Sequence, residues 1–556
     1  MFELHHPFIA YLIRYAVTHP VYKILGDHRY AYEYESYYDK KLHRSRQRMV
    51  RYLGRCDENG KLLVPAKVTV DHVHTTFPVG ALALFYAAAQ DLKVPKVIRE
   101  ALSADAPTTS LVLSLALNQL VHRQPLYHLA EVTHRSPFMT WEELDESQVT
   151  HEAYQIALMT LCRPLAPGFD NAGLHLQERL NEAWRQGSRE PAAVYYDITK
   201  QPYYGTECPY AAVGHDANGN LSNVVGFGMV VSRDHHHPVL CRPLLGSKND
   251  TLGVGETVQM LKGFGYEHLT MVMDRGMVSE ENLKAVTGAG YEQLGIVRGW
   301  NEEAWAYITR WPRELLEQPR FVVERASGTA AYCRSWVAPL YGRRRMRVAV
   351  VENPRRAVDE REARDLALMT LEKGHPSAER LRQIRKVLGR DVAETSQGRR
   401  GFVVNEKVVK EEERGLGRFL LFSTDLSLDA EEMFTLYFQR DAIEKVFEVT
   451  KGELSLGPIR YRRVDRIDAY STVVYMAYLL WSWAERKLKE GWSSAPSEVR
   501  KKYPEMTLSE ALGHLEGVSW VKFGAGEKVR EWATRLTEVQ SAILRPLGAD
   551  KFLPVA

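Results

Sequence analysis

The sequence predicts an α/β protein of several domains, and three observations support this fold class. At 556 residues the chain is too long for a single hydrophobic core, so we expect two to four domains. Hydrophobic residues make up 45% and charged residues 26% of the chain, which is ordinary for soluble globular proteins. From Pro191 onwards, short runs of β-prone residues alternate with segments of helical periodicity.

Charge and hydropathy indicate a cytoplasmic protein without a membrane partner. The net charge is only +3, so any nucleic-acid surface must be local. The five scattered cysteines are typical of reduced thiols. His5, His6 and Arg14 interrupt the apolar residues near the start, so no signal peptide is expected. The apolar run at residues 473–483 is too short to cross a bilayer.

Residues 1–186 are predicted to form a mostly helical, DNA-binding region, although residues 1–60 are compatible with strands or helices. Residues 111–122 and 126–134 have helical periodicity and flank a short break. Two helices around a tight break are compatible with a helix-turn-helix DNA-binding unit, and equally with an ordinary helical hairpin. In the first alternative, four side chains would lie near phosphates: Arg123, His128, His134 and Arg135.

Residues 187–298 contain the element order strand, strand, strand, helix, strand, helix, strand. This is the order of a ribonuclease-H-like core, which the sequence therefore predicts here. Pro243 indicates that the third strand is an edge strand. The predicted strands are residues 192–199, 223–231, 238–245, 269–274 and 291–297, and the predicted helices are 256–262 and 279–286 with a Ser279 N-cap.

A β-rich insertion domain is predicted at residues 299–417. The core elements between Asp274 and Glu444 need only about a third of the residues that separate these two positions, so the rest are inserted. The insertion has predicted strands at 321–324, 336–341 and 346–351 and helices at 359–373 and 378–388. The core is expected to resume at 418–490, beginning with a strand at 418–424. Residues 491–556 are predicted to form a helical tail that serves dimerisation.

Two aspartates occupy positions in or beside apolar strands, which carboxylates avoid unless they are paired, hydrogen-bonded or bound to a metal ion. Asp197 lies inside an apolar strand, and Asp274 ends a buried strand. The structural alternatives are that Asp197 pairs with Lys200, and that Asp274 caps a turn or pairs with Arg275.

The stretch from Tyr437 to Lys451 is predicted to be one helix, because it contains neither Gly nor Pro. At about 100° per residue, Tyr437, Arg440, Glu444 and Lys451 fall within an arc of roughly 60°. The opposite side is apolar and comprises Phe438, Ala442, Ile443, Val446 and Val449. The alternative for the polar face is a solvated stripe of salt bridges.

This spacing resembles the Y-R-E-K signature of DDE transposases of the insertion-sequence-four superfamily. The resemblance covers roughly residues 190–480 and includes Tyr-Asp197-Ile-Thr and Met-Asp274-Arg-Gly-Met. It implies a homodimeric, nucleoid-associated enzyme that binds double-stranded DNA at terminal inverted repeats. Such enzymes catalyse metal-dependent strand cleavage and transfer into target DNA, which is cut-and-paste transposition.

The resemblance also implies roles for individual residues. Asp197 would bridge two Mg²⁺ ions, for which Mn²⁺ can substitute, while Asp274 and Glu444 would hold one ion each. Tyr437, Arg440 and Lys451 would grip phosphates beside the scissile bond. A tryptophan of the insertion would stabilise a flipped base, and any candidate is also a plausible core residue; the candidates are Trp300, Trp305, Trp311 and Trp336.

Two other motifs carry expectations. Arg343, Arg344 and Arg345 lie between two predicted strands, so we expect an exposed hairpin tip that binds DNA. Consecutive histidines at residues 235–237 cannot all converge on one metal ion, so a solvated loop is expected there.

Three other functions compete with a transposase. A nuclease or resolvase of the same fold would cut without strand transfer. A relic would bind DNA without catalysis. A glycosidase would use paired carboxylates, which leaves Arg440 and Lys451 unexplained.

Overall fold

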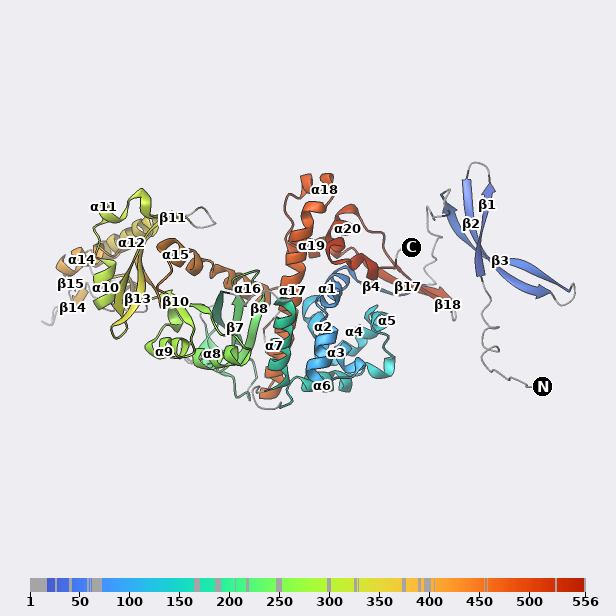
Figure 1. Cartoon of the computed structure of the whole chain (residues 1–556), viewed down its shortest axis with the longest axis horizontal. Helices are drawn as coiled ribbons and strands as arrows, with labels where there is room; N and C mark the ends of the chain where they lie inside the picture. Colours follow the sequence, from blue (N-terminus) through green and yellow to red (C-terminus); the bar gives the residue numbers. More distant parts are fainter. Residues whose placement is uncertain are drawn as a thin grey trace.

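The computed structural model shows an elongated molecule (Figure 1). It describes residues 18–554 except for short gaps. The gaps are residues 26–27, 40–42, 58–59, 61, 63–72, 165–170, 186–191, 206, 217–219, 247–252, 298–301, 325–327, 329, 373–376, 389–391, 395–401, 405, 455, 458 and 526–527. His5, His6, Arg14 and Trp300 therefore lie outside the described residues.

The first described segment is a small antiparallel sheet rather than a helical region. It contains β1 (Thr18–Leu25), β2 (His28–Asp39) and β3 (Arg44–Cys56), in that spatial order. Tyrosines alternate with other residues at Tyr30, Tyr32 and Tyr34, and this period of two suits a strand. The sheet lies at the end of the molecule opposite the insertion (Figure 1), where Arg530 contacts Glu33 at 3.3 Å.

Helices follow, as expected for the rest of the N-terminal region. They are α1 (Gly80–Asp91), α2 (Val94–Leu102), α3 (Ala106–Val121), α4 (Leu126–Arg135), α5 (Phe138–Trp141), α6 (His151–Thr160) and α7 (Ala172–Arg185). Four of them, α1, α3, α6 and α7, pack against α17 (Val464–Gly491), which runs through the middle of the molecule (Figure 1). Helix α3 is buried along most of its length, which makes it a core helix of this bundle.

The central sheet has ten strands in the described part of the chain. Its first strand by sequence, β5 (Ala193–Pro202), lies between β7 (Leu221–Ser232) and β9 (Thr270–Met273). Strands β5, β9 and β10 (Glu292–Ile296) are parallel neighbours, whereas β7 is antiparallel to β5. Strand β8 (Pro238–Leu244) pairs with β7, and β6 (Ala212–His215), which was not predicted, also pairs with β7.

The helices between these strands cover the sheet as their apolar faces require. Helices α8 (Val254–Gly263) and α9 (Glu280–Gly288) lie side by side. Ser279 caps α9 by accepting a hydrogen bond from the Asn282 amide at 3.1 Å, as predicted.

The strands of the insertion do not form a separate β domain. Strands β11 (Val322–Glu324), β12 (Ala330–Leu340) and β13 (Arg344–Glu352) extend the central sheet through β16 (Arg418–Ser423). Strand β16 pairs with β10 on one side and β13 on the other. The remaining insertion elements are α10 (Glu302–Ile308), α11 (Arg313–Leu316), α12 (Pro354–Glu372), α13 (Ala378–Leu388), β14 (Val392–Glu394), β15 (Phe402–Val404) and α14 (Glu406–Glu413).

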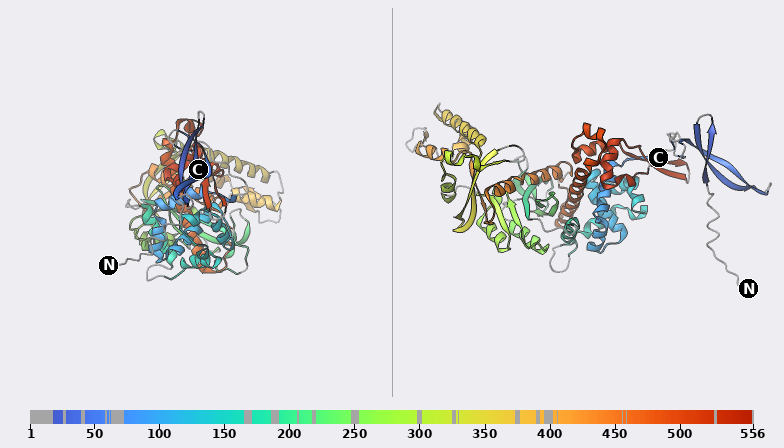
Figure 2. Two further views of the ribbon diagram at one scale, coloured as in Figure 1. Left: turned by 90° about the vertical axis from the view of Figure 1, so that its right-hand side faces the viewer. Right: turned by 45° about the horizontal axis from the view of Figure 1, so that its top comes forward.

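The tail after α17 is only partly helical. It contains α18 (Ser497–Lys502), α19 (Leu508–Leu515) and α20 (Glu538–Leu544). The unpredicted hairpin of β17 (Ser519–Ala525) and β18 (Lys528–Ala533) pairs with β4 (Val73–Pro78) from the other end of the sequence. The two views in Figure 2 also show this C-terminal part beside the N-terminal helices.

No helix in the described ranges is long and apolar enough to cross a membrane. The five cysteines are free thiols, as predicted.

Candidate catalytic site

Asp197 and Asp274 lie next to each other because of how their strands pair. Tyr196 of β5 is the register partner of Met273 of β9. The residues that follow them are Asp197 and Asp274, so these two aspartates are also neighbours. Adjacent strands are about 4.8 Å apart, and side chains alternate between the faces of a sheet. Both aspartates therefore leave the sheet on the face that carries Tyr195.

Glu444 reaches this face from helix α16 (Asp441–Lys451), which packs against β5. Its carboxylate and that of Asp274 contact the same side chain, Arg440. The distances are 3.3 Å from Arg440 Nη1 to Asp274 Oδ1 and 3.4 Å from Arg440 Nη2 to Glu444 Oε1. Asp274 thus pairs with Arg440 across the site. Its side chain does not cap the turn at Arg275–Met277 that follows it, which was the alternative role for this residue.

Arg440 is surrounded by negative charge. Its side chain is 14% exposed, and its guanidinium lies 5.6 Å from the centre of the Tyr437 ring. Burial alone would lower the pKa of Arg440, but Tyr437 and the three acids raise it above its usual value. The charge of Asp197 is among these influences, so all three predicted acids act on this one guanidinium.

Lys451 and Tyr437 complete the polar group. Partial burial lowers the pKa of the Lys451 ammonium, and the negative charge of Asp197 opposes that shift. Burial raises the pKa of Tyr437 to about 12, so its hydroxyl stays protonated at neutral pH. Tyr437, Arg440 and Lys451 therefore lie near the predicted acids, while Glu444 and Lys451 are exposed to solvent and Arg440 pairs with Glu444 along the helix.

The prediction of one continuous helix from Tyr437 to Lys451 is wrong. Helix α15 (Ala430–Phe438) ends before Gln439, and α16 begins at Asp441. The break has a tertiary cause: α15 packs against β12 and β16, whereas α16 packs against β5.

Gln439 at this break is a site residue that the sequence analysis missed. Its Oε1 accepts hydrogen bonds from Arg233 Nε at 3.0 Å and from the Tyr195 hydroxyl at 3.3 Å. These bonds tie the start of α16 to the strand that carries Asp197. No local pattern marks Gln439, because its partners lie more than 200 residues away.

The donor set suits a hard divalent cation, since carboxylate oxygens are the ligands that Mg²⁺ and Mn²⁺ prefer. As placed, however, no three His, Cys, Asp or Glu side chains within the described residues form a group that could hold a metal ion. Arg440 supplies positive charge between Asp274 and Glu444 instead.

Arg343, Arg344 and Arg345 lie at an exposed hairpin tip, as expected. Leu340 is the register partner of Arg344, and the turn residues Tyr341, Gly342 and Arg343 all have positive φ. Arg344 Nη1 donates to the Thr287 hydroxyl at 3.3 Å. The tip lies at the sheet edge opposite the acids, because β13 starts there and runs in the same direction as β9.

The histidine run is only partly solvated. His235 and His236 are exposed with positive φ, as expected for a loop. His237 is buried, which corrects the prediction. Its ring stacks on Trp184 at 5.1 Å, its Nδ1 lies 2.7 Å from the Ser232 hydroxyl, and burial lowers its pKa to about 3.

The predicted N-terminal helix pair is present as α3 and α4. Arg123 pairs with Glu453 at 3.5 Å, and Arg135 pairs with Glu131 within α4. Their proposed contact with phosphates stays a prediction.

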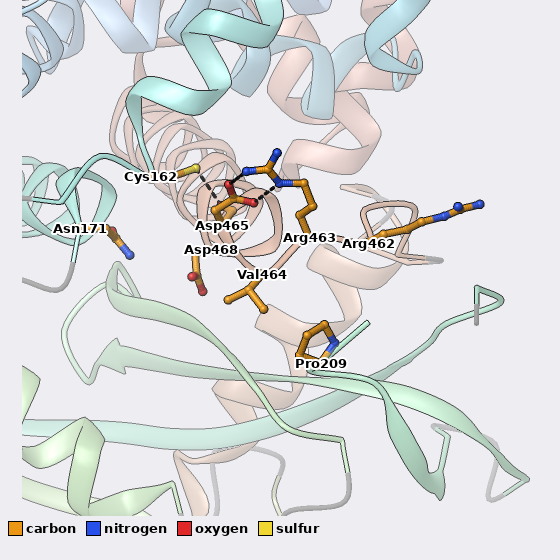
Figure 3. Close-up of a pocket in the computed structure, with 8 residues that line it drawn as sticks. All are labelled: Cys162, Asn171, Pro209, Arg462, Arg463, Val464, Asp465 and Asp468. Atoms are coloured by element: carbon orange, nitrogen blue, oxygen red, sulfur yellow. Dashed lines mark hydrogen bonds and ion pairs between the residues drawn. The ribbon is translucent and has the colours of Figure 1, made fainter. Parts of the chain in front are cut away.

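A cavity of about 570 Å³ lies away from the acids, beside the start of α17 (Figure 3). Its described lining includes Cys162, Asp465 and Asp468 and none of the three predicted acids. Cys162 Sγ contacts the Asp465 carbonyl at 2.8 Å, and burial raises the pKa of this thiol to about 12. A thiol with so high a pKa is a poor nucleophile.

One family model matches the chain. Residues 199–480 match the family described as Transposase DDE domain, and this segment includes Asp274 and Glu444 and begins two residues after Asp197. No curated protein sequence matches the chain. Among solved structures, the chain is similar to a piggyBac transposase in a synaptic complex with hairpin DNA. That similarity has 10% identity and a TM-score of 0.35, over 72% of this chain and 74% of the other. Because the matched segment spans just over half of the sequence, the chain belongs to the transposase DDE domain family.

Proposed function

We propose that this protein is a cut-and-paste DNA transposase of the insertion-sequence-four superfamily. It would bind terminal inverted repeats, cleave DNA there and join the ends to target DNA. The observation that carries the proposal is the grouping of three acids around Arg440, with Lys451 beside them. A glycosidase needs two carboxylates but no such cations, whereas a phosphodiester substrate needs both.

The ribonuclease-H-like core belongs to this proposal and would comprise residues 187–298 and 418–490. The strand order β8, β7, β5, β9, β10 supports it, with β5, β9 and β10 parallel. In such a core the first and fourth strands lie side by side and carry acids, as β5 and β9 do here.

Asp197, Asp274 and Glu444 would hold two Mg²⁺ ions, or Mn²⁺ in their place. These ions would activate a water or 3′-hydroxyl and stabilise the leaving oxygen. Arg440 and Lys451 would bind phosphate oxygens beside the scissile bond, and the protonated Tyr437 hydroxyl would donate a hydrogen bond. Gln439 would position α16, and hence Glu444, relative to Asp197.

The partners in this proposal are double-stranded DNA and a second copy of the chain. The N-terminal region would contribute DNA contacts and the tail after residue 491 would contribute to the dimer. The site of action would be the nucleoid in the cytoplasm.

The experiment is a cleavage assay on DNA that spans the ends of the element, with Mg²⁺, with Mn²⁺ and with chelator. Metal-dependent nicking followed by joining to a second DNA supports the transposase. Nicking without joining would identify a nuclease, and binding without either reaction would identify a relic.

A further inference from the structure

Three arginines of the insertion gather around three aromatic rings. The guanidinium carbon of Arg334 lies 3.5 Å from the centre of the Trp311 ring and 4.9 Å from that of Phe321. Arg310 lies 5.2 Å from Trp311 and 5.3 Å from Trp336, and Arg320 lies 4.8 Å from Phe321. We call Arg310, Arg320, Arg334, Trp311, Trp336 and Phe321 the arginine–aromatic cluster.

The positive charges of this cluster are not balanced from within the described chain. None of the three guanidinium groups forms an ion pair with a carboxylate of the described residues. Arg334 instead has its pKa lowered, first by burial and then by the charges of Arg320 and Arg310. Arg418, by contrast, pairs with the buried carboxylate of Glu352 at 2.9 Å.

Two neutral donors in the same cluster also lack an acceptor. The buried Nε1 atoms of Trp311 and Trp336 have no hydrogen-bond partner within the described residues. A buried donor without an acceptor costs about 1–3 kcal/mol. Unbalanced cations beside unsatisfied N–H groups are the complement of an anion with several acceptor oxygens.

The stacking geometry favours phosphate over a simple anion. A guanidinium that lies on an aromatic ring keeps its N–H donors in plane and free, and its fork matches two phosphate oxygens. The rings also hold the arginines in place, which reduces the entropy lost on binding.

The position of the cluster fits DNA that extends from the acids. Strand pairing puts Ser335, the neighbour of Arg334, in one row with Ile296 of β10. The pairing of β10 with β9 puts Asp274 at the same level along the strands. Strand β12 is four steps from β9, or about 19 Å at the usual strand spacing. Arg334 leaves the other face of the sheet from Asp274, so the DNA would have to bend round the sheet to contact both.

We propose that the arginine–aromatic cluster binds backbone phosphates of DNA that extends beyond the scissile bond. The identity of the ligand as DNA rests on the proposed function, whereas the anion site rests on the cluster itself. The exposed arginines Arg310 and Arg320 would make the first contacts, and the half-buried Arg334 would fix the strand position.

The test measures binding of the full chain to a 40-base-pair duplex spanning the element end, in chelator so that no cleavage occurs. Each phosphate contact contributes about 0.9 to the slope of log affinity against log salt. The variant Arg310→Gln/Arg320→Gln/Arg334→Gln should lower that slope by 2 to 3. A control with equal charge change is Arg179→Gln/Arg356→Gln/Arg486→Gln, whose arginines pair with Glu182, Glu360 and Glu490. The control should lower the slope by less than 1.

Two further measurements distinguish a loss of phosphate contacts from a folding defect in the triple variant. The double variant Arg310→Gln/Arg320→Gln changes exposed side chains only, and it should melt at the same or a higher temperature without DNA, because repulsion is relieved. Tryptophan emission of the wild-type chain should change when the duplex binds, and this change should shrink in the double variant.

Equal slopes for the cluster and control variants would overturn the proposal. Loss of self-association with unchanged DNA binding would also overturn it and would indicate an acidic surface of a second copy. The proposed transposase reaction is judged separately: cleavage with an unchanged slope rejects only the cluster, and a lowered slope without cleavage rejects only the reaction.

Discussion

Arg440 is predicted to compete with divalent cations for the acids. Its guanidinium contacts Asp274 and Glu444, whose side chains are 44% and 61% exposed. Ion pairs with such exposed carboxylates are worth a few tenths to 1 kcal/mol each. In chelator, Arg440→Gln should therefore lower the stability of the catalytic core by about 1 kcal/mol, or about 2–4 °C in Tm for a domain of this size.

Metal should reverse this loss. An ion at 100 times its Kd stabilises the folded chain by about 2.7 kcal/mol. In the wild-type chain, part of this gain, about 1 kcal/mol, is offset because the contacts of Arg440 with the acids are lost. The variant has no such contacts to lose, so its Tm should rise by about 2–4 °C more than that of the wild type.

The assay is thermal unfolding of both proteins in chelator, in Mg²⁺ and in Mn²⁺. Arg356→Gln is the matched control, since Arg356 pairs with Glu360 at 2.7 Å on a helix of the insertion. The control should show the same metal-induced rise as the wild type. An equal rise in Arg440→Gln and wild type would refute the competition, and Arg440 would then be a structural partner of the acids only.

The remaining predictions address catalysis, the core, pH dependence and the hairpin tip. Asp197→Asn should abolish end cleavage and leave end binding in a gel-shift assay nearly intact, because phosphate contacts supply most DNA affinity; an equal loss of binding would make Asp197 structural. Arg418→Met removes one of two arginine partners of the fully buried Glu352, at 2.9 Å, and leaves Arg313 at 2.8 Å, so it should cost about 1.5–3 kcal/mol in denaturant unfolding; a variant that also replaces Arg313, Arg313→Met/Arg418→Met, should lose more, because the buried carboxylate then has neither arginine. Burial lowers the pKa of His122 to about 4, so between pH 6.5 and 4 the imidazole is protonated in the unfolded chain but not in the folded one. The free energy of unfolding should therefore fall by about 1.4 kcal/mol per pH unit as the pH drops through that window, and less steeply in His122→Gln. Replacing Arg343, Arg344 and Arg345 with Ala should weaken end binding and lower the salt slope by about 0.9 per lost phosphate contact; an unchanged slope would mean that the tip does not touch DNA.

Local periodicity was sufficient to predict many individual elements and the residues they carry. The run around Asp197 forms β5, the run before Asp274 forms β9, and the helix expected at residues 378–388 is α13 with the same bounds. These patterns are legible because the alternation of apolar residues depends only on near neighbours along the chain. Ser279 is a further example, because an N-cap acts within three residues.

The tertiary structure decided how these elements combine. Strand pairing joins the insertion to the core sheet through β16 and joins β4 to β17, and hydrogen bonds between such distant segments leave no local pattern. The break at Gln439 follows from helices that pack on different strands. The sequence by itself determined that Asp197 shares a face of β5 with Tyr195, because side chains alternate along a strand. Only the folded chain decided that Arg440 also contacts Asp274, because that contact requires the end of β9 to meet the start of α16, two segments far apart in the sequence.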